Sequence, residues 1–419
     1  MKILIVTQYF WPESFIINNL AKTLVEQGHT IQVLTGKPNY PEGKIFPGYS
    51  AKGCMNELFG EIPVYRVPLR PRGKGGAINL ALNYLSFVWN GLLFFHRKVR
   101  SQSFDIILVY APSPITAVIP AIYLKWKLKS HLAVWVQDLW PESLSATGFI
   151  RNKQMLYLVG LMVRIIYACT DIVFASSEAF KKPIRKYTSP RKSIQYYPNP
   201  YPDNYPKIVS SSSSRIPAAL LREMEQNFCV VFAGNLGKAQ AVETLISAAE
   251  KLKGLLPNCK LILVGSGSMS SWIEEQKSDR NLDNLILAGR FPAEEMPHFF
   301  SRADGLLVTL AREEIFTYTI PSKVQAYLSS GRPIIAALDG EGKQLIERAG
   351  AGLCCPTEDS LGLAHCIEQL FYMPQVERER LGVAGRSYFL ENFEIERQSR
   401  KLVEIFETRI GRTKDIFRP

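Results

Sequence analysis

The chain alternates short apolar runs with longer stretches in which apolar residues recur at helical spacing. The short runs are rich in Val, Ile and Leu, as in strands of a parallel sheet that is buried on both faces. Helical patterns between such strands predict an α/β fold with doubly wound layers. The predicted strands are 2–7, 30–35, 106–110, 132–137 and 172–175 in the first half, and 229–233, 260–264, 285–288, 305–309 and 333–337 in the second.

The two sets of strands predict two Rossmann-like domains. Between them, residues 198–217 hold five prolines and a run of serines, a composition typical of a linker. We therefore expect an N-terminal domain over 1–205, a linker over 206–217 and a C-terminal domain over 218–393.

One segment, 77–95, departs from this pattern because it is long and apolar enough to approach the span of a bilayer. Four polar residues recur along one of its faces: Asn79, Asn83, Ser86 and Asn90. Burying that face in lipid would be costly. Basic residues flank the segment: Arg66, Arg70, Arg72 and Lys74 before it, and His96, Arg97, Lys98 and Arg100 after it. We expect an amphipathic helix at an anionic membrane surface, with a crossover helix buried in the first domain as the alternative and a membrane span disfavoured.

The composition is that of a globular protein, with 47% hydrophobic and 21% charged residues. The net charge of +12 favours an anionic partner, either a phosphorylated substrate or anionic lipid. Nucleic acid is disfavoured because no zinc-finger, RNA-recognition or basic-zipper pattern occurs. Seven cysteines without a C-x-x-C pair predict buried thiols in a reducing compartment. The N-terminus is typical of a core strand rather than of a signal peptide, so we expect a cytoplasmic protein.

The segment 319–335 (TIPSKVQAYLSSGRPII) predicts a phosphate site. Ser322 and Gln325 fit a capping box at a helix N-terminus, and Gly331 ends the helix. Free N–H groups and the positive dipole end suit a phosphate at such a position. Lys323 places a positive charge beside the positive end of the helix dipole, which is unfavourable unless an anion lies next to it. The alternative is a lysine that is simply solvated.

A second glycine-rich loop follows the strand at 229–233 and carries Asn235, Lys238 and Gln240. Glycine at the end of a strand allows the backbone to approach a ligand, and Lys238 can reach a pyrophosphate. A third turn holds Gly265 and Gly267. It is a further candidate for ligand binding, although glycines in such a turn can also serve tight packing alone. No G-x-G-x-x-G follows the first strand, which argues against an NAD site there.

Two aromatic loops in the first half, 9–14 (YFWPES) and 134–143 (VWVQDLWPES), follow or end a predicted strand. Ligands of parallel sheets collect at the carboxyl ends of strands, so these loops predict a sugar site. Carboxylates there can bond hydroxyls and move protons, although those of the second loop can instead cap the next helix. We predict Asp138 and Glu13 as catalytic residues, and Gln137, Glu142 and Trp11 as acceptor-binding residues.

These features together resemble the retaining glycosyltransferases of family four, over nearly the whole chain. The resemblance includes the turn at 28–33, the loop and helix at 232–249, the segment 289–304 and the helix-G-x-P element at 327–333. YFWPES, VQDLWPES and TIPSKVQAYL look most similar to the branch that adds fucose or N-acetylfucosamine-type sugars in bacterial capsule, colanic acid and O-antigen synthesis.

The resemblance implies the GT-B fold, in which two Rossmann-like domains face each other across a cleft, with a C-terminal helix within 394–419 packing back on the first domain. The first domain would bind a polyprenyl-diphosphate-linked glycan at the inner face of the cytoplasmic membrane. The second would bind a nucleotide diphosphate sugar, with no metal and no further cofactor. The residues implied in donor binding are Asn235, Lys238, Gln240, Gly265, Gly267, Arg290, Phe291, Ser322, Lys323 and Glu341.

The chain departs from the family pattern at five positions. Asn235 and Gln240 stand where the family usually has an arginine and a lysine, and Tyr318 and Ala326 where it has two glutamates. Gln137 stands where many members have a histidine. The two missing glutamates leave open a non-catalytic nucleotide-sugar-binding relative, and a sugar-nucleotide epimerase of similar build is a second alternative to a transferase.

Overall fold

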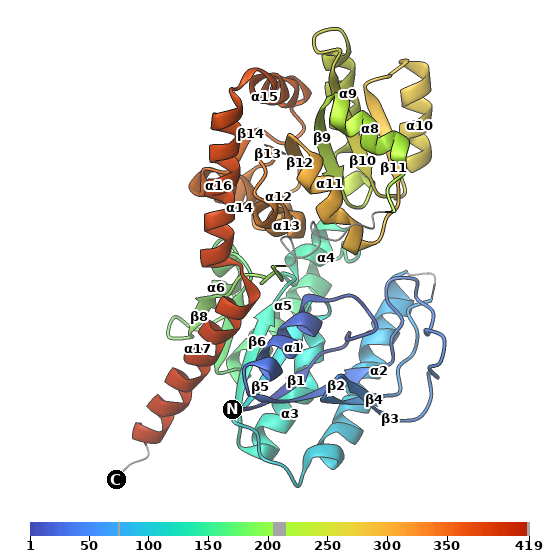
Figure 1. The fold of residues 1–419 in the computed structure, drawn as a ribbon. Coiled ribbons are helices and arrows are strands. Elements are labelled where there is room, and N and C mark those ends of the chain that lie inside the picture. Colours follow the sequence, from blue (N-terminus) through green and yellow to red (C-terminus); the bar gives the residue numbers. More distant parts are fainter. Residues whose placement is uncertain (74–75, 204–214, 417–419) are drawn as a thin grey trace. The chain divides into compact units, whose positions relative to one another are not determined.

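The structure is a computed structural model that describes residues 1–73, 76–203 and 215–416. The chain forms two compact α/β units (Figure 1). Unit 1 comprises Met1–Pro200 and the C-terminal segment from Ile395, and unit 2 comprises Tyr201–Glu394. The predicted linker at 206–217 falls mostly outside the described residues.

Unit 1 is built on an eight-stranded sheet in the order β3-β4-β2-β1-β5-β6-β7-β8. All neighbouring strands are parallel except β3, which pairs with β4 in the antiparallel sense. The order reverses beside β1, which pairs with both β2 and β5. The strands are β1 (Lys2–Val6), β2 (Thr30–Gly36), β3 (Met55–Phe59), β4 (Ile62–Val67), β5 (Ile106–Ala111), β6 (His131–Val136), β7 (Ile172–Ala175) and β8 (Ile194–Tyr196).

Helices cover this sheet. They are α1 (Ile16–Glu26), α2 (Ala77–Val99), α3 (Val118–Leu128), α4 (Glu142–Ala146), α5 (Lys153–Cys169), α6 (Lys181–Arg185) and α17 (Ile395–Ile416). The last helix belongs to unit 1 (Figure 1), because Leu402 and Phe406 are buried in one hydrophobic cluster with β1 and α1. The Tyr197 hydroxyl also donates to the Gln398 carbonyl at 3.2 Å.

The polar face of α2 points into unit 1 rather than toward solvent or lipid. Asn83 is fully buried, and its side-chain oxygen accepts a hydrogen bond from the Gln8 amide at 2.7 Å. The outward face carries the exposed apolar residues Ile78, Leu85, Trp89 and Leu93. By length and composition alone α2 could cross a membrane. Here it packs against α3 and β4. The polar side chains that would be costly to bury in lipid therefore face other parts of the protein.

Unit 2 contains a six-stranded parallel sheet in the order β11-β10-β9-β12-β13-β14. The strands are β9 (Phe228–Ala233), β10 (Cys259–Val264), β11 (Leu285–Gly289), β12 (Gly305–Thr309), β13 (Ile334–Ala337) and β14 (Gly352–Cys355). The order reverses between β9 and β12, which creates the topological switch point where doubly wound folds bind ligands.

The helices of unit 2 are α8 (Ala218–Gln226), α9 (Val242–Lys253), α10 (Ser270–Asp279), α11 (Met296–Arg302), α12 (Glu314–Thr317), α13 (Ser322–Ser330), α14 (Gly340–Ala349), α15 (Ser360–Tyr372) and α16 (Gln375–Asn392). Residues of α9 and α15 form one hydrophobic cluster with the sheet, and residues of α11, α13, α14 and α16 form another. The sheet is therefore covered on both faces (Figure 1), and the predicted α/β fold class is confirmed.

Each strand predicted from the sequence is present, with ends that differ by at most one residue. Sequence analysis missed β3, β4, β8 and β14. The first two form an antiparallel hairpin in which buried and exposed residues alternate, so no continuous apolar run marks them. The other two are short and mostly half-buried, so no continuous apolar run marks them either.

Candidate active site

Unit 2 contains a pocket of about 460 Å³ at the carboxyl ends of β9, β10 and β11. Its volume is within the range of small-molecule sites. It is lined by Gly234, Asn235, Val264, Gly265, Ser266, Gly267, Arg290, Phe291 and Met296. Sequence analysis selected five of these residues from three separate segments, and the fold brings them together.

The glycines of this pocket are required by the close approach of two loops. A Cβ atom on Gly265 would lie 1.8 Å from the Gly234 carbonyl oxygen, and one on Gly267 would lie 2.3 Å from the Leu236 carbonyl oxygen. Gly265 also has a φ of 143°, which disfavours other residues. These glycines are therefore needed for the two loops to pack against each other. The backbone of both loops also lines the pocket.

Lys323 lies at the switch point beside the loop that follows β9. Its ammonium donates a hydrogen bond to the Gln240 side-chain oxygen at 2.6 Å and lies 3.8 Å from the centre of the Phe232 ring. A Cβ atom on Gly234 would lie 3.3 Å from the same nitrogen. Burial lowers the pKa of Lys323 to about 7. A lysine held in this way, with an amide rather than a carboxylate as partner, is a candidate ligand for an anion.

The predicted capping box at α13 is wrong, although the helix begins at Ser322 and ends before Gly331 as expected. The N-cap residue is Pro321, and its position receives no side-chain capping bond. Gln325, with its amide turned to donate, bonds the carbonyls of Pro321 and Ser322 instead of an N–H group. The first N–H groups of α13 therefore lack a side-chain cap, as in an anion-binding N-terminus.

Three other predicted donor residues lie apart from the pocket lining. Lys238 is exposed on a short 3-10 turn, and Ser322 is exposed at the start of α13. Glu341 is buried in the first turn of α14, where its carboxylate accepts a hydrogen bond from Arg348 at 2.8 Å.

A second pocket of unit 2, about 200 Å³, was not predicted from the sequence. It lies at the carboxyl ends of β12 and β13, and its lining includes Arg312, Glu313, Asp339 and Thr357. Position at the ends of parallel strands is the signal that points to it, because no motif does.

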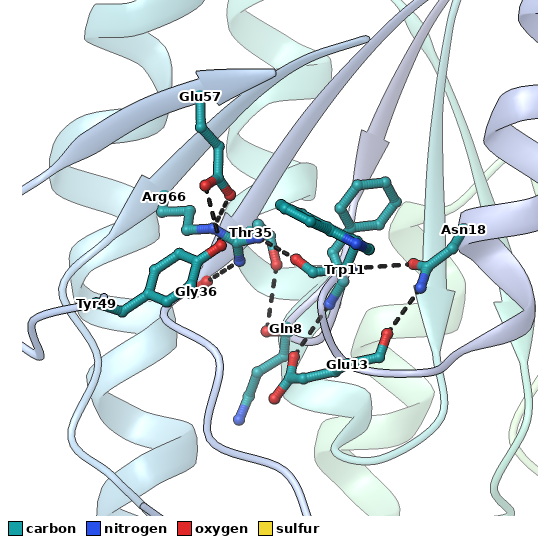
Figure 2. Close-up of polar contacts among 10 residues, drawn as sticks. Gln8, Trp11, Glu13, Asn18, Thr35, Gly36, Tyr49, Glu57 and Arg66 are labelled. Atoms are coloured by element: carbon teal, nitrogen blue, oxygen red, sulfur yellow. Dashed lines mark hydrogen bonds and ion pairs between the residues drawn. The ribbon is translucent and has the colours of Figure 1, made fainter. Parts of the chain in front are cut away.

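Glu13 joins two loops at the carboxyl ends of β1 and β2, and Figure 2 shows its place in the first of them. Its carboxylate accepts hydrogen bonds from the backbone N–H groups of Phe10 (3.2 Å), Asn39 (2.8 Å) and Tyr40 (2.7 Å). The residue is 1% exposed. Burial raises the pKa of Glu13 to about 7, and the three N–H donors and the Arg66 charge partly offset this. Since backbone groups occupy its oxygens, this geometry favours loop positioning over direct contact with a substrate.

Arg66 also supports these loops. From the sequence it was noted only as one of the basic residues that precede the segment 77–95. Its side chain is fully buried, pairs with Glu57 and donates to the carbonyls of Gly36 (2.8 Å) and Trp11 (Figure 2). The Trp11 ring, 37% exposed, lies 5.5 Å from the Phe59 ring. The Trp11 loop is thus held through its backbone while its indole remains accessible.

Asp138 follows β6 and lies next to Trp140, whose indole N–H donates to its carboxylate at 3.1 Å. Burial raises the pKa of Asp138, and nearby hydrogen-bond donors partly offset the effect. The side-chain nitrogen of neighbouring Gln137 is buried with no hydrogen-bond partner among the described residues. An unpartnered buried donor is costly, which makes this corner of unit 1 a candidate site.

Glu142 already has partners within unit 1. Its carboxylate accepts a hydrogen bond from the Tyr187 hydroxyl at 3.2 Å, and the Lys186 ammonium lies 3.9 Å away. Among the carboxylates predicted from the two aromatic loops, Asp138 is therefore the one whose surroundings best fit a reacting group.

Two family profiles match the chain. The profile described as Glycosyl transferases group 1 covers residues 227–372, and that described as Glycosyl transferase 4-like domain covers residues 15–200. The chain belongs to this glycosyltransferase family. The second profile lies within unit 1 and the first within unit 2, so the match extends over both sheets.

Among curated proteins, the glycosyltransferase is similar to the probable glycosyltransferase WbjE of Pseudomonas aeruginosa, with 24% identity over 70% of this chain and 72% of that protein. It is also similar to the putative colanic acid biosynthesis glycosyl transferase WcaI of Escherichia coli, with 23% identity over 94% of this chain and 97% of that protein.

Solved structures share the fold. HepE of Anabaena in complex with UDP has a TM-score of 0.67 at 15% identity, covering 97% of this chain and 100% of that chain. Sucrose-phosphate synthase of Thermosynechococcus elongatus has a TM-score of 0.72 at 17% identity, covering 97% of this chain and 98% of that chain. These likenesses confirm the predicted GT-B fold.

Proposed function

We propose that this glycosyltransferase moves a sugar from a nucleoside diphosphate sugar to a hydroxyl of a glycan, with retention of anomeric configuration. The observation that carries the proposal is the unit 2 pocket, where the loops after β9, β10 and β11 converge close to the partly buried Lys323. A pocket for a nucleoside beside a cation and an uncapped helix N-terminus suits a nucleotide diphosphate.

In the proposed complex, Arg290 and Phe291 contact the base, and the diphosphate lies between Lys323 and the N-terminus of α13. Negative charge grows on this diphosphate as the bond from the anomeric carbon to its oxygen breaks. A preorganised cation and helix dipole stabilise that charge most in the transition state, which is how they accelerate the reaction. We propose that these groups act without a metal ion.

The acceptor hydroxyl attacks the anomeric carbon on the face that the diphosphate leaves. Its oxygen forms the new glycosidic bond while its proton passes to the departing phosphate oxygen, so no covalent enzyme intermediate is needed. Asp138 orients the hydroxyl, since its carboxylate lies at the end of β6 next to the Trp140 indole and the unpartnered side-chain nitrogen of Gln137.

We further propose that the acceptor is a polyprenyl-diphosphate-linked glycan at the cytoplasmic face of the membrane. Support comes from the name of one relative, which refers to colanic acid biosynthesis, and from an exposed surface on α2 and α3 that combines apolar and basic side chains. We call this the α2–α3 surface; it comprises Leu85, Trp89, Leu93 and Trp126 together with Arg97, Lys98, Lys127 and Lys129. Such a combination suits an anionic membrane interface.

The test is thermal unfolding with UDP, GDP and NAD added separately. A ligand at 100 times its dissociation constant stabilises by about 2.7 kcal/mol. We expect a shift with UDP or GDP and none with NAD. No shift with either nucleotide would contradict a donor site in unit 2.

A second assay separates transfer from epimerisation. Nucleotide sugar is incubated with the enzyme alone and with a prenyl-diphosphate-linked sugar. Conversion of the donor sugar without acceptor would favour the epimerase, whereas an acceptor-dependent product with the same anomeric configuration supports the retaining transferase.

A further inference from the structure

Arg72 lies in the segment between β4 and α2, and its guanidinium lies over the rings of two tyrosines. The guanidinium carbon is 5.0 Å from the centre of the Tyr40 ring and 5.9 Å from that of the Tyr9 ring. The residue is half-buried, and Tyr9 is 2% exposed. Cation–π contacts with two rings hold a guanidinium in place without using its N–H groups, which stay available for hydrogen bonds.

The N–H groups of this guanidinium have no partner among the residues that the structure describes. No described side chain or carbonyl accepts a hydrogen bond from the guanidinium, and no described carboxylate lies within 4.0 Å of it. An arginine has five N–H donors, and a partly desolvated cation without a counter-charge is unfavourable. In contrast, the buried Arg66 nearby has both a carboxylate and carbonyl partners.

The position of Arg72 is fixed through its backbone. Its N–H donates to the Asn39 side-chain oxygen at 3.1 Å. The N–H groups of Asn39 and of Tyr40 in turn donate to the Glu13 carboxylate. The buried carboxylate therefore positions both the anchor of Arg72 and the Tyr40 ring that its guanidinium contacts.

Arg72 and Asp138 share a neighbour, Tyr84. Burial raises the pKa of Tyr84, while the charge of Arg72 lowers it and that of Asp138 raises it. The Tyr84 ring lies 6.2 Å from the Trp140 ring, and Trp140 donates to Asp138. The unpartnered cation thus lies in the same corner of unit 1 as the proposed acceptor site.

We propose that Arg72, on its platform of Tyr9 and Tyr40, binds the phosphate of a phosphorylated acceptor, and that Glu13 is a positioning residue for it. The proposal rests on the function proposed above, since it names the acceptor group that unit 1 recognises. A planar guanidinium with free N–H groups can donate to two phosphate oxygens at once, a geometry that a lysine ammonium does not offer.

The experiment measures calorimetric binding of three probes to the full chain: geranyl diphosphate, with and without saturating UDP; UDP alone; and phosphatidylglycerol vesicles. We compare the wild type with Arg72→Gln, Arg72→Lys and the matched control Arg70→Gln, which removes an exposed charge two residues away. Because Arg72 is anchored through its backbone N–H, its substitutions keep the Asn39 bond, and unchanged thermal unfolding verifies this.

We expect Arg72→Gln to weaken geranyl diphosphate binding by about tenfold to a hundredfold, as loss of charge-assisted hydrogen bonds predicts. Arg72→Lys should be intermediate, and Arg70→Gln should stay within about twofold of the wild type. The Glu13→Gln change should weaken the same binding and, combined with Arg72→Gln, add nothing further, because it acts through Arg72.

Absence of geranyl diphosphate binding in the wild type, or equal binding by Arg72→Gln, would overturn the proposal. A loss confined to UDP would assign Arg72 to the donor, and a loss confined to vesicles would assign it to lipid headgroups. Failure of UDP to bind the wild type would count against the proposed function, while the geranyl diphosphate arm without UDP would still report on Arg72.

Discussion

The Lys323 ammonium donates to the Gln240 side-chain oxygen at 2.6 Å, joining the first turn of α13 to the loop after β9. Gln240 stands where the family usually has a lysine. The structure therefore places a cation beside that position from a different element. Its uncharged partner does not neutralise it, which leaves the charge available to a diphosphate.

The first prediction is that Lys323→Met lowers kcat/KM about a hundredfold to a thousandfold in a transfer assay. The change removes a preorganised charge from the point where the leaving group becomes negative. Lys238→Met should cost only a few fold, because that side chain is exposed on a surface turn. Equal losses in both variants would show that the diphosphate does not depend on Lys323 more than on Lys238.

The second prediction concerns protons. Burial lowers the pKa of Lys323 from 10.5 to about 7, so near pH 8.5 the free enzyme holds it mostly neutral. A diphosphate beside it favours the charged form, so UDP binding at that pH should take up close to one proton. UDP affinity should accordingly fall as pH rises through the range above 7.

Calorimetry in buffers of different ionisation enthalpy measures this uptake directly. The Lys323→Met variant provides the control, because it has no ammonium to charge and should take up none. Wild-type binding without proton uptake would mean that the ammonium is already charged or lies away from the nucleotide.

The sequence predicted the parts of this fold that continuous apolar runs specify. Strands such as β1 and β10 are buried on both faces, so their composition alone identifies them. The hairpin β3–β4 was not predicted because its burial alternates. It also contains a charged residue, Arg66, whose burial depends on the ion pair with Glu57 that forms only in the folded protein.

The candidate sites show the same division. Glycine turns at strand ends indicated the unit 2 pocket, since backbone conformation is encoded locally. The roles of Glu13 and Arg72 depend on contacts between loops 26 to 33 residues apart, and no local pattern encodes them. The inward direction of the polar face of α2 was also missed, because its partner Gln8 lies 75 residues away.

A third prediction separates the carboxylates of the loop after β6. Asp138→Asn should lower kcat about a hundredfold by misorienting the acceptor hydroxyl, with the dissociation constant of UDP unchanged. Glu142→Gln should have a small effect on kcat, since Tyr187 and Lys186 already occupy that carboxylate. Rates at saturating substrate, with UDP binding measured separately, provide the comparison. A larger loss in the glutamate variant would reverse the assignment.

A fourth prediction tests the close approach of the two loops in unit 2. Gly265→Ala would place a methyl group 1.8 Å from the Gly234 carbonyl oxygen at an unfavourable φ, which should cost more than about 1–3 kcal/mol and weaken UDP binding. Gly254→Ala is the control, because it has a φ of −86° and open space around it. It should be neutral or stabilising by up to about 1 kcal/mol. Thermal unfolding gives both values, and equal stability of the two variants would contradict the close approach.

The fifth prediction concerns the α2–α3 surface. If it lies on the membrane, replacing Leu85 and Trp89 with serine should reduce binding to phosphatidylglycerol vesicles at least tenfold at low salt, since both side chains are more than half exposed and apolar. Leu58→Ser on β3 is the matched control, because this leucine is as exposed but lies outside the surface. Co-sedimentation measures the bound fraction, and binding should weaken as salt rises because basic side chains contribute. A double variant that binds vesicles as the wild type does, or a wild type that stays in the supernatant at low salt, would remove this surface from the proposed function and leave the donor site unaffected.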